Sequence, residues 1–406
     1  MAKKKRIKLN DQQLMLDASR VADIYHQMTI DLFDQVIDRV RERGTASLED
    51  NPYIWQLEKM SEMGLLNKDN IKLIARYSGV AEEQLRYVIE NEGYKVYKDT
   101  KTQLLESMGG GDFVTNNLIQ TMLANYVNQT TGDIDNLINT TLPKSVRKVY
   151  QDIVEEAVAK VVTGLMNPDK AISTTVMKWA EKGFYGFTDK GGKRWRADAY
   201  ARTIIKTTSW RVYREARKAP ADELGIDTFY YSMKPAAREM CAPLQHQIVT
   251  TGQARIEEGE KIFALDDYGY GKPGGCQGIN CGHTMTPFIP GANYKPDLPE
   301  HLANLTPEEA IENANAQSKQ RAIERSIRKS KELLHVANKL EDEELISKYK
   351  GQVKSKQAAM RSYLAQHPFL HRDYLRERYY SDPLREAETE IKLRKQQKKK
   401  AGDPTS

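Results

Sequence analysis

The residues of this chain best suited to chemistry are its three cysteines and a nearby histidine. Cys276, Cys281 and His283 lie close together, and Cys241 lies upstream. Thiolate and imidazole ligands in this number could complete a tetrahedral zinc site, although the spacing is not one of the tight paired forms. The alternative is that the cysteines are small buried side chains and His283 bonds a loop carbonyl. We therefore treat Cys241, Cys276, Cys281 and His283 as a candidate structural zinc site.

Two further patterns suggest chemistry only superficially. Cys241 and His246 are close enough to suggest a thiol enzyme, but a catalytic thiolate needs an activating positive environment and a pocket, and the sequence indicates neither. The glycines of 269–274 match a dinucleotide-binding pattern, but Pro273 and Gly274 lead into a loop and not into a helix. We predict no catalytic residues, no enzyme activity and no small-molecule substrate.

Basic residues are concentrated at the two ends of the chain. The net charge is +6, yet residues 1–8 carry five basic side chains and residues 392–400 carry six, with no acid in either segment. Without these eleven charges the remainder is near −5, so a broad DNA-binding face on it is not expected. The ends could neutralise phosphates as flexible arms, or they could be solvated tails. The candidate nucleic-acid contacts are Lys3, Lys4, Lys5, Arg6, Lys398, Lys399 and Lys400.

The elements that must position these residues are mostly helical. Apolar residues recur at helical spacing across 11–43, which predicts one long amphipathic helix or two in series. Gly64, Gly79 and Gly93 punctuate the next segment, so we expect a bundle of three short helices. The short helices are expected at 52–63, 67–78 and 81–90; later helices are expected at 113–128, 143–165, 168–182 and 196–217, with a hairpin at 183–194.

The cysteines lie in a segment with a different residue composition. Strand-forming residues at 228–233, 248–251, 262–265 and 285–289 are separated by loops rich in Gly and Pro. This predicts a compact α+β module. Strands then cease, and Thr306 with Pro307 and Glu309 forms a helix start. Charged helix continues from there, with interruption, to about residue 364.

Together these features predict a mainly α protein with a small α+β module: a multi-helical N-terminal half, a short Gly/Cys-rich β module and long charged C-terminal helices. No apolar run approaches the ~20 residues that cross a bilayer, so we expect a cytosolic protein without a membrane partner. The expected divisions are a basic tail at 1–10, a helical bundle at 11–108, a helical domain at 112–226, the Cys/His module at 227–293, a charged helical region at 300–391 and a basic tail at 392–406.

The chain resembles the phage minor capsid, or minor head, protein family. The run from Cys276 through His283 to Pro287-Phe288-Ile289-Pro290-Gly291 is the most specific part of the resemblance. The chain departs from the family pattern at His246, where a glycine is expected, and at Gly282, where an arginine often precedes the histidine. Other matching segments are 201–203, 237–238, 241–245, 268–269 and 275–276, with a further feature at 60–74.

The resemblance implies a structural protein of a tailed phage that works by assembly contacts. It implies portal and other capsid proteins as partners, and a location in the virion near the portal after assembly in the host cytoplasm. The charge of the basic ends adds packaged DNA as a further expected contact. Two other functions remain open at this point. One is a nucleic-acid-binding module that uses the Cys/His loop and the tails, and the other is a toxin or effector in 227–293 that is carried in the virion.

Overall fold

The computed structural model describes residues 5–6, 12–42, 44–114, 116–183, 185–188, 192, 194–279, 281–379 and 383–400. The chain divides into two compact units, and each is assembled from three separate stretches. Unit 1 comprises 1–19, 85–130 and 205–321, and unit 2 comprises 20–84, 131–204 and 322–406. These units cut across the consecutive divisions expected from the sequence.

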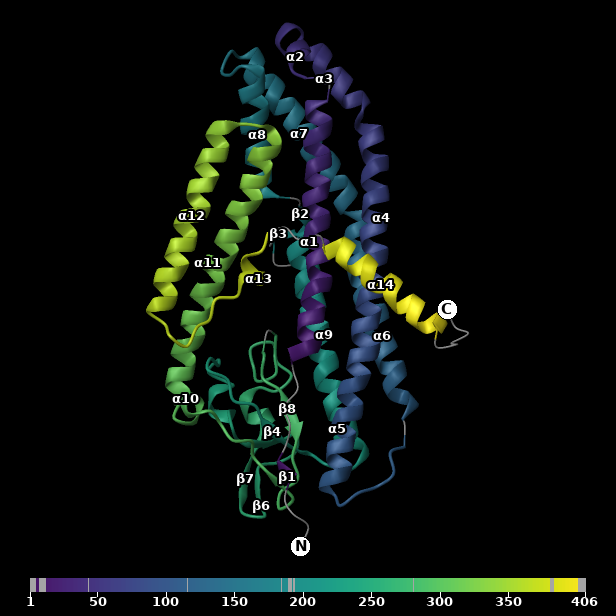
Figure 1. The fold of residues 1–406 in the computed structure, drawn as a ribbon, viewed down its shortest axis with the longest axis vertical. Helices are drawn as coiled ribbons and strands as arrows, with labels where there is room; N and C mark the ends of the chain where they lie inside the picture. Colours follow the sequence, from purple (N-terminus) through teal and green to yellow (C-terminus); the bar gives the residue numbers. More distant parts are fainter. Residues whose placement is uncertain are drawn as a thin grey trace. The chain divides into compact units, whose positions relative to one another are not determined.

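Helices make up most of the chain, and the mainly α fold class is confirmed (Figure 1). The helices before the β module are α1 (Gln12–Arg41), α2 (Ala46–Asp50), α3 (Pro52–Ser61), α4 (Met63–Tyr87), the π-helical segment η1 (Val88–Glu92), α5 (Gly93–Ser107), α6 (Asn117–Thr140), α7 (Leu142–Val162), α8 (Pro168–Lys182) and α9 (Ala197–Glu223). Those after it are α10 (Glu300–Ala303), α11 (Pro307–Leu340), α12 (Glu343–Ala365), α13 (Tyr374–Glu377) and α14 (Pro383–Lys400).

The core of unit 2 contains the predicted apolar stripe of α1. Ile24, Leu32 and Val36 are at most 1% exposed, as the helical spacing requires of a face turned to the interior. The helix ends also follow the sequence signals. Asn167 caps α8 by accepting a hydrogen bond from the Lys170 amide, Pro168 occupies the first turn, and Gly183 ends the helix with φ 72°.

The prediction of three short helices from Pro52 onward is wrong in part. Helix α4 runs without a break from Met63 to Tyr87 and passes through Gly64 and Gly79. No atom lies within 4 Å of a Cβ built on either glycine, so neither marks a close approach. A glycine inside a helix costs only about 1 kcal/mol relative to alanine, and the packing of the flanking apolar residues outweighs that cost.

Unit 1 contains a five-stranded mixed sheet of order β6-β7-β5-β4-β8. The strands are β4 (Thr228–Tyr231), β5 (Ile248–Thr250), β6 (Arg255–Glu257), β7 (Glu260–Ala264) and β8 (Met285–Pro287). β5 and β7 are parallel, and the other pairs are antiparallel. The four predicted strands are confirmed, while β6 was not predicted. A short parallel pair joins β1 (Lys5–Arg6) to β9 (Asn293–Tyr294).

Every residue of β4 is buried. Since successive residues of a strand point to opposite sides, both faces of the sheet are covered at β4. Tyr230 packs with Ile248, Ile262 and Phe288 on one face. The other face carries Phe229 and Tyr231 in a larger cluster. This larger cluster also includes Leu104 of α5, Ala221 of α9, Ala310 of α11 and all three cysteines.

The predicted hairpin before α9 is present as an antiparallel pair of β2 (Tyr185–Thr188) and β3 (Arg194–Arg196). Its expected turn falls largely outside the described residues. The predicted helix start at Thr306 is confirmed as a reciprocal cap. The Thr306 amide donates to Glu309 Oε2 at 2.9 Å, and the Glu309 amide donates to Thr306 Oγ1 at 3.2 Å.

Candidate functional site

The loops at one end of the small sheet bring two cysteines and a histidine together. Cys241 precedes the short 3₁₀ helix η2 (Ala242–Leu244), which lies between β4 and β5. Cys281 and His283 lie in the loop that leads into β8. β4 pairs with both β5 and β8, so the segments that flank these strands meet in space.

The three side chains form a compact buried cluster. Cys241 Sγ lies 3.7 Å from Cys281 Sγ, and Cys281 Sγ lies 3.6 Å from His283 Nδ1. Their ligand atoms all lie within 4.8 Å of one another. The three residues are 1%, 3% and 4% exposed. We call Cys241, Cys281 and His283 the thiol cluster.

Gln245 fixes the tautomer of His283. Gln245 Oε1 accepts a hydrogen bond from the Lys234 amide at 2.7 Å, and His283 Nε2 lies 2.9 Å from the same oxygen. An amide oxygen can only accept, so His283 Nε2 must carry a proton and donate it. In the neutral imidazole, Nδ1 then holds a lone pair, and that lone pair faces Cys281.

The two thiols of the cluster are not equivalent. The hydrogen bond between them, together with burial, raises the pKa of Cys241. The same hydrogen bond, with Cys241 as donor, holds the pKa of Cys281 well below its usual range. Tyr231 Oη lies 3.8 Å from Cys281 Sγ, and its ring stacks on His283 with centroids 5.1 Å apart. Burial raises the pKa of Tyr231, so its hydroxyl stays protonated.

A half-buried cation lies behind the loop that carries Cys281. Arg214 of α9 donates hydrogen bonds to the carbonyls of Gln277 and Cys281, the latter at 2.6 Å. Burial lowers the pKa of Arg214, while the neighbouring Cys281 raises it in part. A fixed positive charge beside the sulfurs favours thiolate, which is the form that binds metals.

Cys276, the fourth residue of the candidate zinc site, is not placed in the cluster. Its thiol points to the Leu265 carbonyl at 3.6 Å, and burial raises its pKa to about 12. The structure therefore brings together three of the four predicted ligands. Sequence reasoning missed Tyr231 and Gln245 as their neighbours. Gln245 stands in the matching 241–245 segment, but residue type alone does not show that its oxygen reaches His283.

His246 also lies away from the thiol cluster. Its Nδ1 is 3.0 Å from Tyr230 Oη, on a residue that packs on the other face of the sheet. Its φ of 59° is in the left-handed region that glycine tolerates best, which accounts for the glycine expected there. At Gly282, where the family pattern often has arginine, an added Cβ would lie 3.4 Å from Lys234 Nζ. Lys234 supplies a cation near that position.

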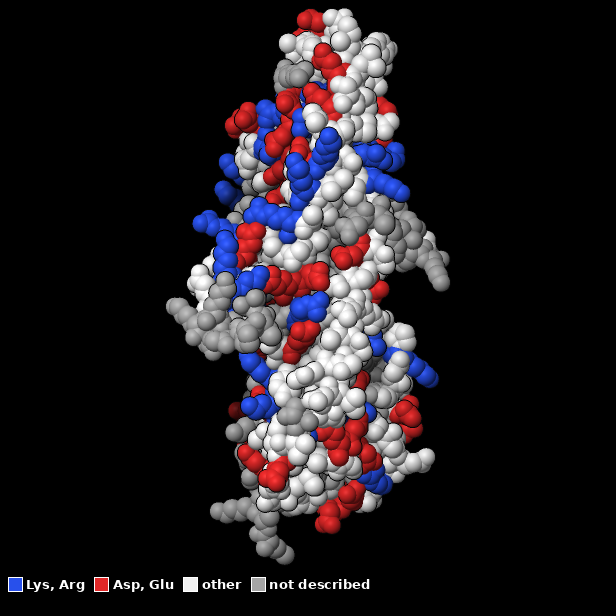
Figure 2. All heavy atoms as spheres, turned by 90° about the vertical axis from the view of Figure 1, so that its right-hand side faces the viewer, with Lys and Arg blue, Asp and Glu red and all other residues white. Residues whose placement is uncertain are grey.

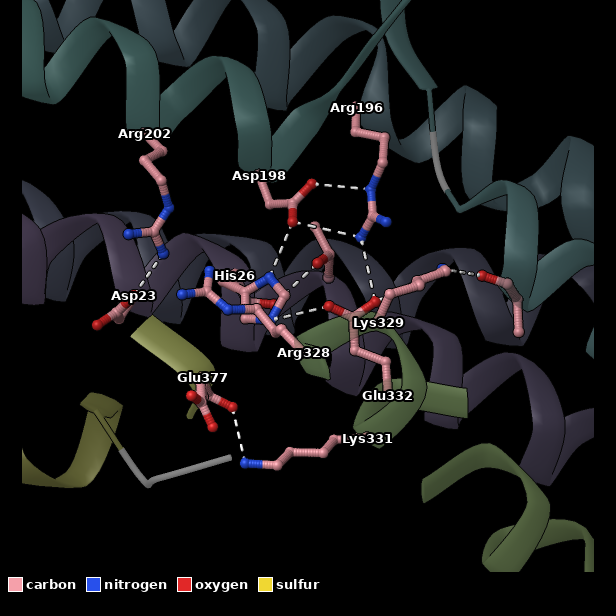
Figure 3. A network of polar contacts seen from close by, with 12 residues as sticks. Asp23, His26, Arg196, Asp198, Arg202, Arg328, Lys329, Lys331, Glu332 and Glu377 are labelled. Atoms are coloured by element: carbon pink, nitrogen blue, oxygen red, sulfur yellow. Dashed lines mark hydrogen bonds and ion pairs between the residues drawn. The ribbon is translucent and has the colours of Figure 1, made fainter. Parts of the chain in front are cut away.

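Unit 2 contains a second buried polar cluster, which we call the His26 network (Figure 3). His26 of α1 lies between two carboxylates, with Nδ1 2.8 Å from Asp198 Oδ2 and Nε2 3.4 Å from Glu332 Oε1. Arg196 Nε lies 3.2 Å from Asp198 Oδ1, and Arg202 pairs with Asp23. The other cations in the figure are Arg328, Lys329 and Lys331 of α11.

Opposite charges balance one another in the His26 network. Burial alone would raise the pKa of Asp198, but Arg196 and His26 more than offset it and hold that pKa far below its usual range. Burial lowers the pKa of Lys329, whose ammonium donates to the Ala180 carbonyl at 2.8 Å. Arg328 donates to the Arg376 carbonyl at 2.7 Å. The network ties α1, α8, α9 and α11 together through ion pairs and hydrogen bonds.

The candidate nucleic-acid contacts are described only in part. Lys3 and Lys4 lie outside the described residues, and Lys5 and Arg6 are described as backbone in β1. Lys398, Lys399 and Lys400 end helix α14, again as backbone. Two other basic residues of that segment bond to α4: Arg394 to Gln84 Oε1 at 2.8 Å, and Lys395 to Glu83 at 3.0 Å.

Surface charge is mixed elsewhere. On the face in Figure 2, acidic and basic side chains are interspersed. A cleft of about 1200 Å³ within unit 2 is likewise lined by both signs, including Asp69, Lys72, Arg76 and Glu388. It contains no part of the thiol cluster. Among the described residues, no helix is long and apolar enough to cross a membrane.

Comparison with known proteins identifies the class. The family described as phage minor capsid protein 2 matches residues 9–365. A structural protein of Lactococcus phage LL-H is 29% identical over 371 residues, which cover 88% of this chain and 98% of that protein. A structural protein of Lactococcus phage mv4 is 33% identical over 118 residues, which cover 29% of this chain and 92% of that protein. No solved structure gives a significant match.

A family match over most of the chain confirms the resemblance seen in the sequence. The chain belongs to the phage minor capsid protein 2 family. It is therefore a capsid protein of a phage, and its role is structural.

Proposed function

We propose that this chain is a minor head protein of a tailed phage that assembles with the portal during head formation. Family membership supports the capsid role. The portal as partner rests on the resemblance of the sequence and on an exposed apolar surface of α3. We do not assign a catalytic role, because the charged groups of the His26 network pair with one another and the thiol cluster is closed by burial.

The observation that carries the proposal is the outer face of α3. Tyr53, Ile54 and Leu57 are 66%, 54% and 71% exposed. Their spacing of three and four residues makes them neighbours on the helix surface. The opposite face is occupied by Trp55 and Lys59, which are 1% and 2% exposed. An amphipathic helix in a stable fold needs one apolar face, so the second is available for docking to another protein.

The first test is quantitative mass spectrometry of purified virions and DNA-free procapsids. We expect the chain in both particles, at a few copies each. Absence from both would overturn the virion role and favour a protein that acts outside the particle. Presence in virions but not in procapsids would contradict assembly with the portal before packaging.

The second test addresses the α3 face itself. Leu57→Ser and Tyr53→Ser should reduce incorporation into procapsids, because docking would bury these side chains. Lys68→Ser, an exposed residue of α4 outside this face, is the control and should be incorporated normally. Thermal unfolding of the purified variants must match that of the unchanged protein, since an exposed side chain contributes little to stability. Normal incorporation of both variants would exclude this face.

We further propose that the basic ends contact packaged DNA, which the charge distribution supports. Arg394 and Lys395 are engaged within unit 2, so the contact would fall to Lys3–Arg6 and Lys398–Lys400. Glutamine at these positions should make the salt dependence of DNA binding less steep, because fewer counterions are released. An unchanged slope would show that these residues do not contact DNA.

A further inference from the structure

We infer that Cys241, Cys281 and His283 bind a single zinc ion that holds the module around the sheet together. The distances between the ligand atoms match those of a zinc site. In a tetrahedral site with Zn–S bonds of about 2.3 Å, the two sulfurs lie about 3.8 Å apart. The observed distance between Cys241 Sγ and Cys281 Sγ is 3.7 Å, and the distance from Cys281 Sγ to His283 Nδ1 is 3.6 Å.

His283 is oriented as a metal ligand would be. Metal-bound histidines commonly donate their other N–H to an oxygen that fixes the ring. Gln245 Oε1 takes that part here: it is held by the Lys234 amide at 2.7 Å and accepts from His283 Nε2 at 2.9 Å. The nitrogen left with a lone pair is Nδ1, which is the atom turned to the sulfurs. This arrangement places three electron-pair donors within 4.8 Å of one another.

The types of the three ligand atoms indicate which ion they bind. Thiolate sulfur and imidazole nitrogen select zinc and other soft or borderline ions over Mg²⁺ and Ca²⁺, which prefer oxygen. Two thiolates and one divalent ion are neutral together, which suits a site at most 4% exposed. Tyr231 Oη lies against the same sulfur at 3.8 Å and closes a further side of the cluster.

The location explains what the ion would do. Cys241 precedes η2, and Cys281 lies in a loop 40 residues later, so one ion would join two segments that are remote in sequence. Between them the chain forms β5, β6 and β7, and residues 269–279, which include the positive-φ Gly269 and Gly271, then form neither helix nor strand. An ion bound there stabilises the folded module by its binding free energy, because the unfolded chain does not hold the three ligands together.

The test uses the full chain, purified without chelator. Elemental analysis should find one zinc per chain. Replacement of the zinc by Co²⁺ should give the absorption bands of a tetrahedral thiolate complex. Cys281→Ser and His283→Gln should each lose the metal. Cys276→Ser is the matched control: it alters a buried thiol of the same module outside the cluster and should retain one zinc.

A second variant keeps the test decisive if Cys281→Ser fails to fold. Gln245→Leu leaves all three ligands but releases the ring of His283, and should weaken zinc affinity roughly 10- to 100-fold in competition with a chelator. Gln245→Glu preserves the acceptor and should restore most of the affinity. Equal zinc affinity of the Leu and Glu variants would contradict the role of Gln245 in positioning His283.

Two results would overturn the zinc site. One is a protein without bound zinc, which takes up none from solution and whose three thiols all react with a thiol reagent after denaturation. The other is an intact mass that shows the loss of two hydrogens, because it would mean that Cys241 and Cys281 form a disulfide. Either result leaves the assembly role untouched, since incorporation into procapsids is measured separately.

Discussion

The His26 network of unit 2 and the thiol cluster of unit 1 are both buried polar groups, but their composition differs. In the His26 network, carboxylates face guanidinium, ammonium and imidazole groups. In the thiol cluster, two sulfurs and an imidazole nitrogen face one another. The first arrangement places opposite charges against one another. The second presents donors of one kind to a common point, and that arrangement favours an added cation.

The two clusters also connect segments that are distant in sequence in different ways. Asp198 and His26 are 172 residues apart, and their ion pair fixes α9 to α1 within unit 2. Cys241 and Cys281 are 40 residues apart, and they lie in loops and not on facing helices. Rigid helices can hold charged groups at a fixed distance, whereas two loops would be held together by a metal ion that both of them bind.

The largest effect is expected from breaking the His26 network. Asp198→Ala leaves Arg196 and His26 buried without their carboxylate and should cost roughly 3–5 kcal/mol in the free energy of unfolding. Asp152→Ala is the control, because its partner Lys148 is 75% exposed, and it should cost less than about 1 kcal/mol. Urea denaturation measures both. Similar losses for the two variants would mean that the network does not behave as a buried one.

Acid should distinguish the two regions next. The pKa of Asp198 is lower in the folded protein than in the unfolded chain. Such a carboxyl stabilises the fold above its unfolded pKa of about 3.9, and the stabilisation is lost as the pH falls below it. The difference in stability between the unchanged protein and Asp198→Asn should therefore shrink between about pH 5 and pH 2. A difference that stays constant with pH would contradict the lowered pKa.

The smallest effect concerns the backbone at His246, away from the thiol cluster. His246 has φ 59°, a conformation that costs a residue with a Cβ about 1–2 kcal/mol. Both His246→Gly and His246→Ala remove the hydrogen bond to Tyr230, but only glycine also relieves the strain. The Gly variant should thus be about 1 kcal/mol more stable than the Ala variant in urea denaturation. Equal stabilities would show that position 246 is not strained.

Local signals in the sequence were sufficient for many elements. The helix expected at 168–182 has the observed bounds of α8, and the Thr306 pattern predicts the start of α11. Gly64 and Gly79 were misleading, because their cost in a helix is small beside the packing of α4. Glycine is a reliable break only where φ is positive, as at Gly183.

The candidate site could be predicted only in part. Residue type pointed to Cys241, Cys281 and His283, yet nothing in the spacing shows that Cys276 turns toward the Leu265 carbonyl. The direction of a side chain in a loop depends on backbone angles that residue type does not determine. The His26 network was out of reach, because its members are ordinary charged residues on separate helices.

The division of each unit into three stretches determines the order in which the protein can be completed on the ribosome. Unit 1 has all its residues once synthesis reaches Arg321, whereas unit 2 also requires α12, α13 and α14, which follow it. The carboxylates and apolar face of α1 beyond Ser19 therefore wait for α11 and α12 to emerge. A nascent chain that stalls after Arg321 holds one complete unit and one with an open core, which is the form that chaperones and proteases recognise. Premature termination after Arg321 should consequently remove the protein from assembly by degradation and not by loss of a docking surface.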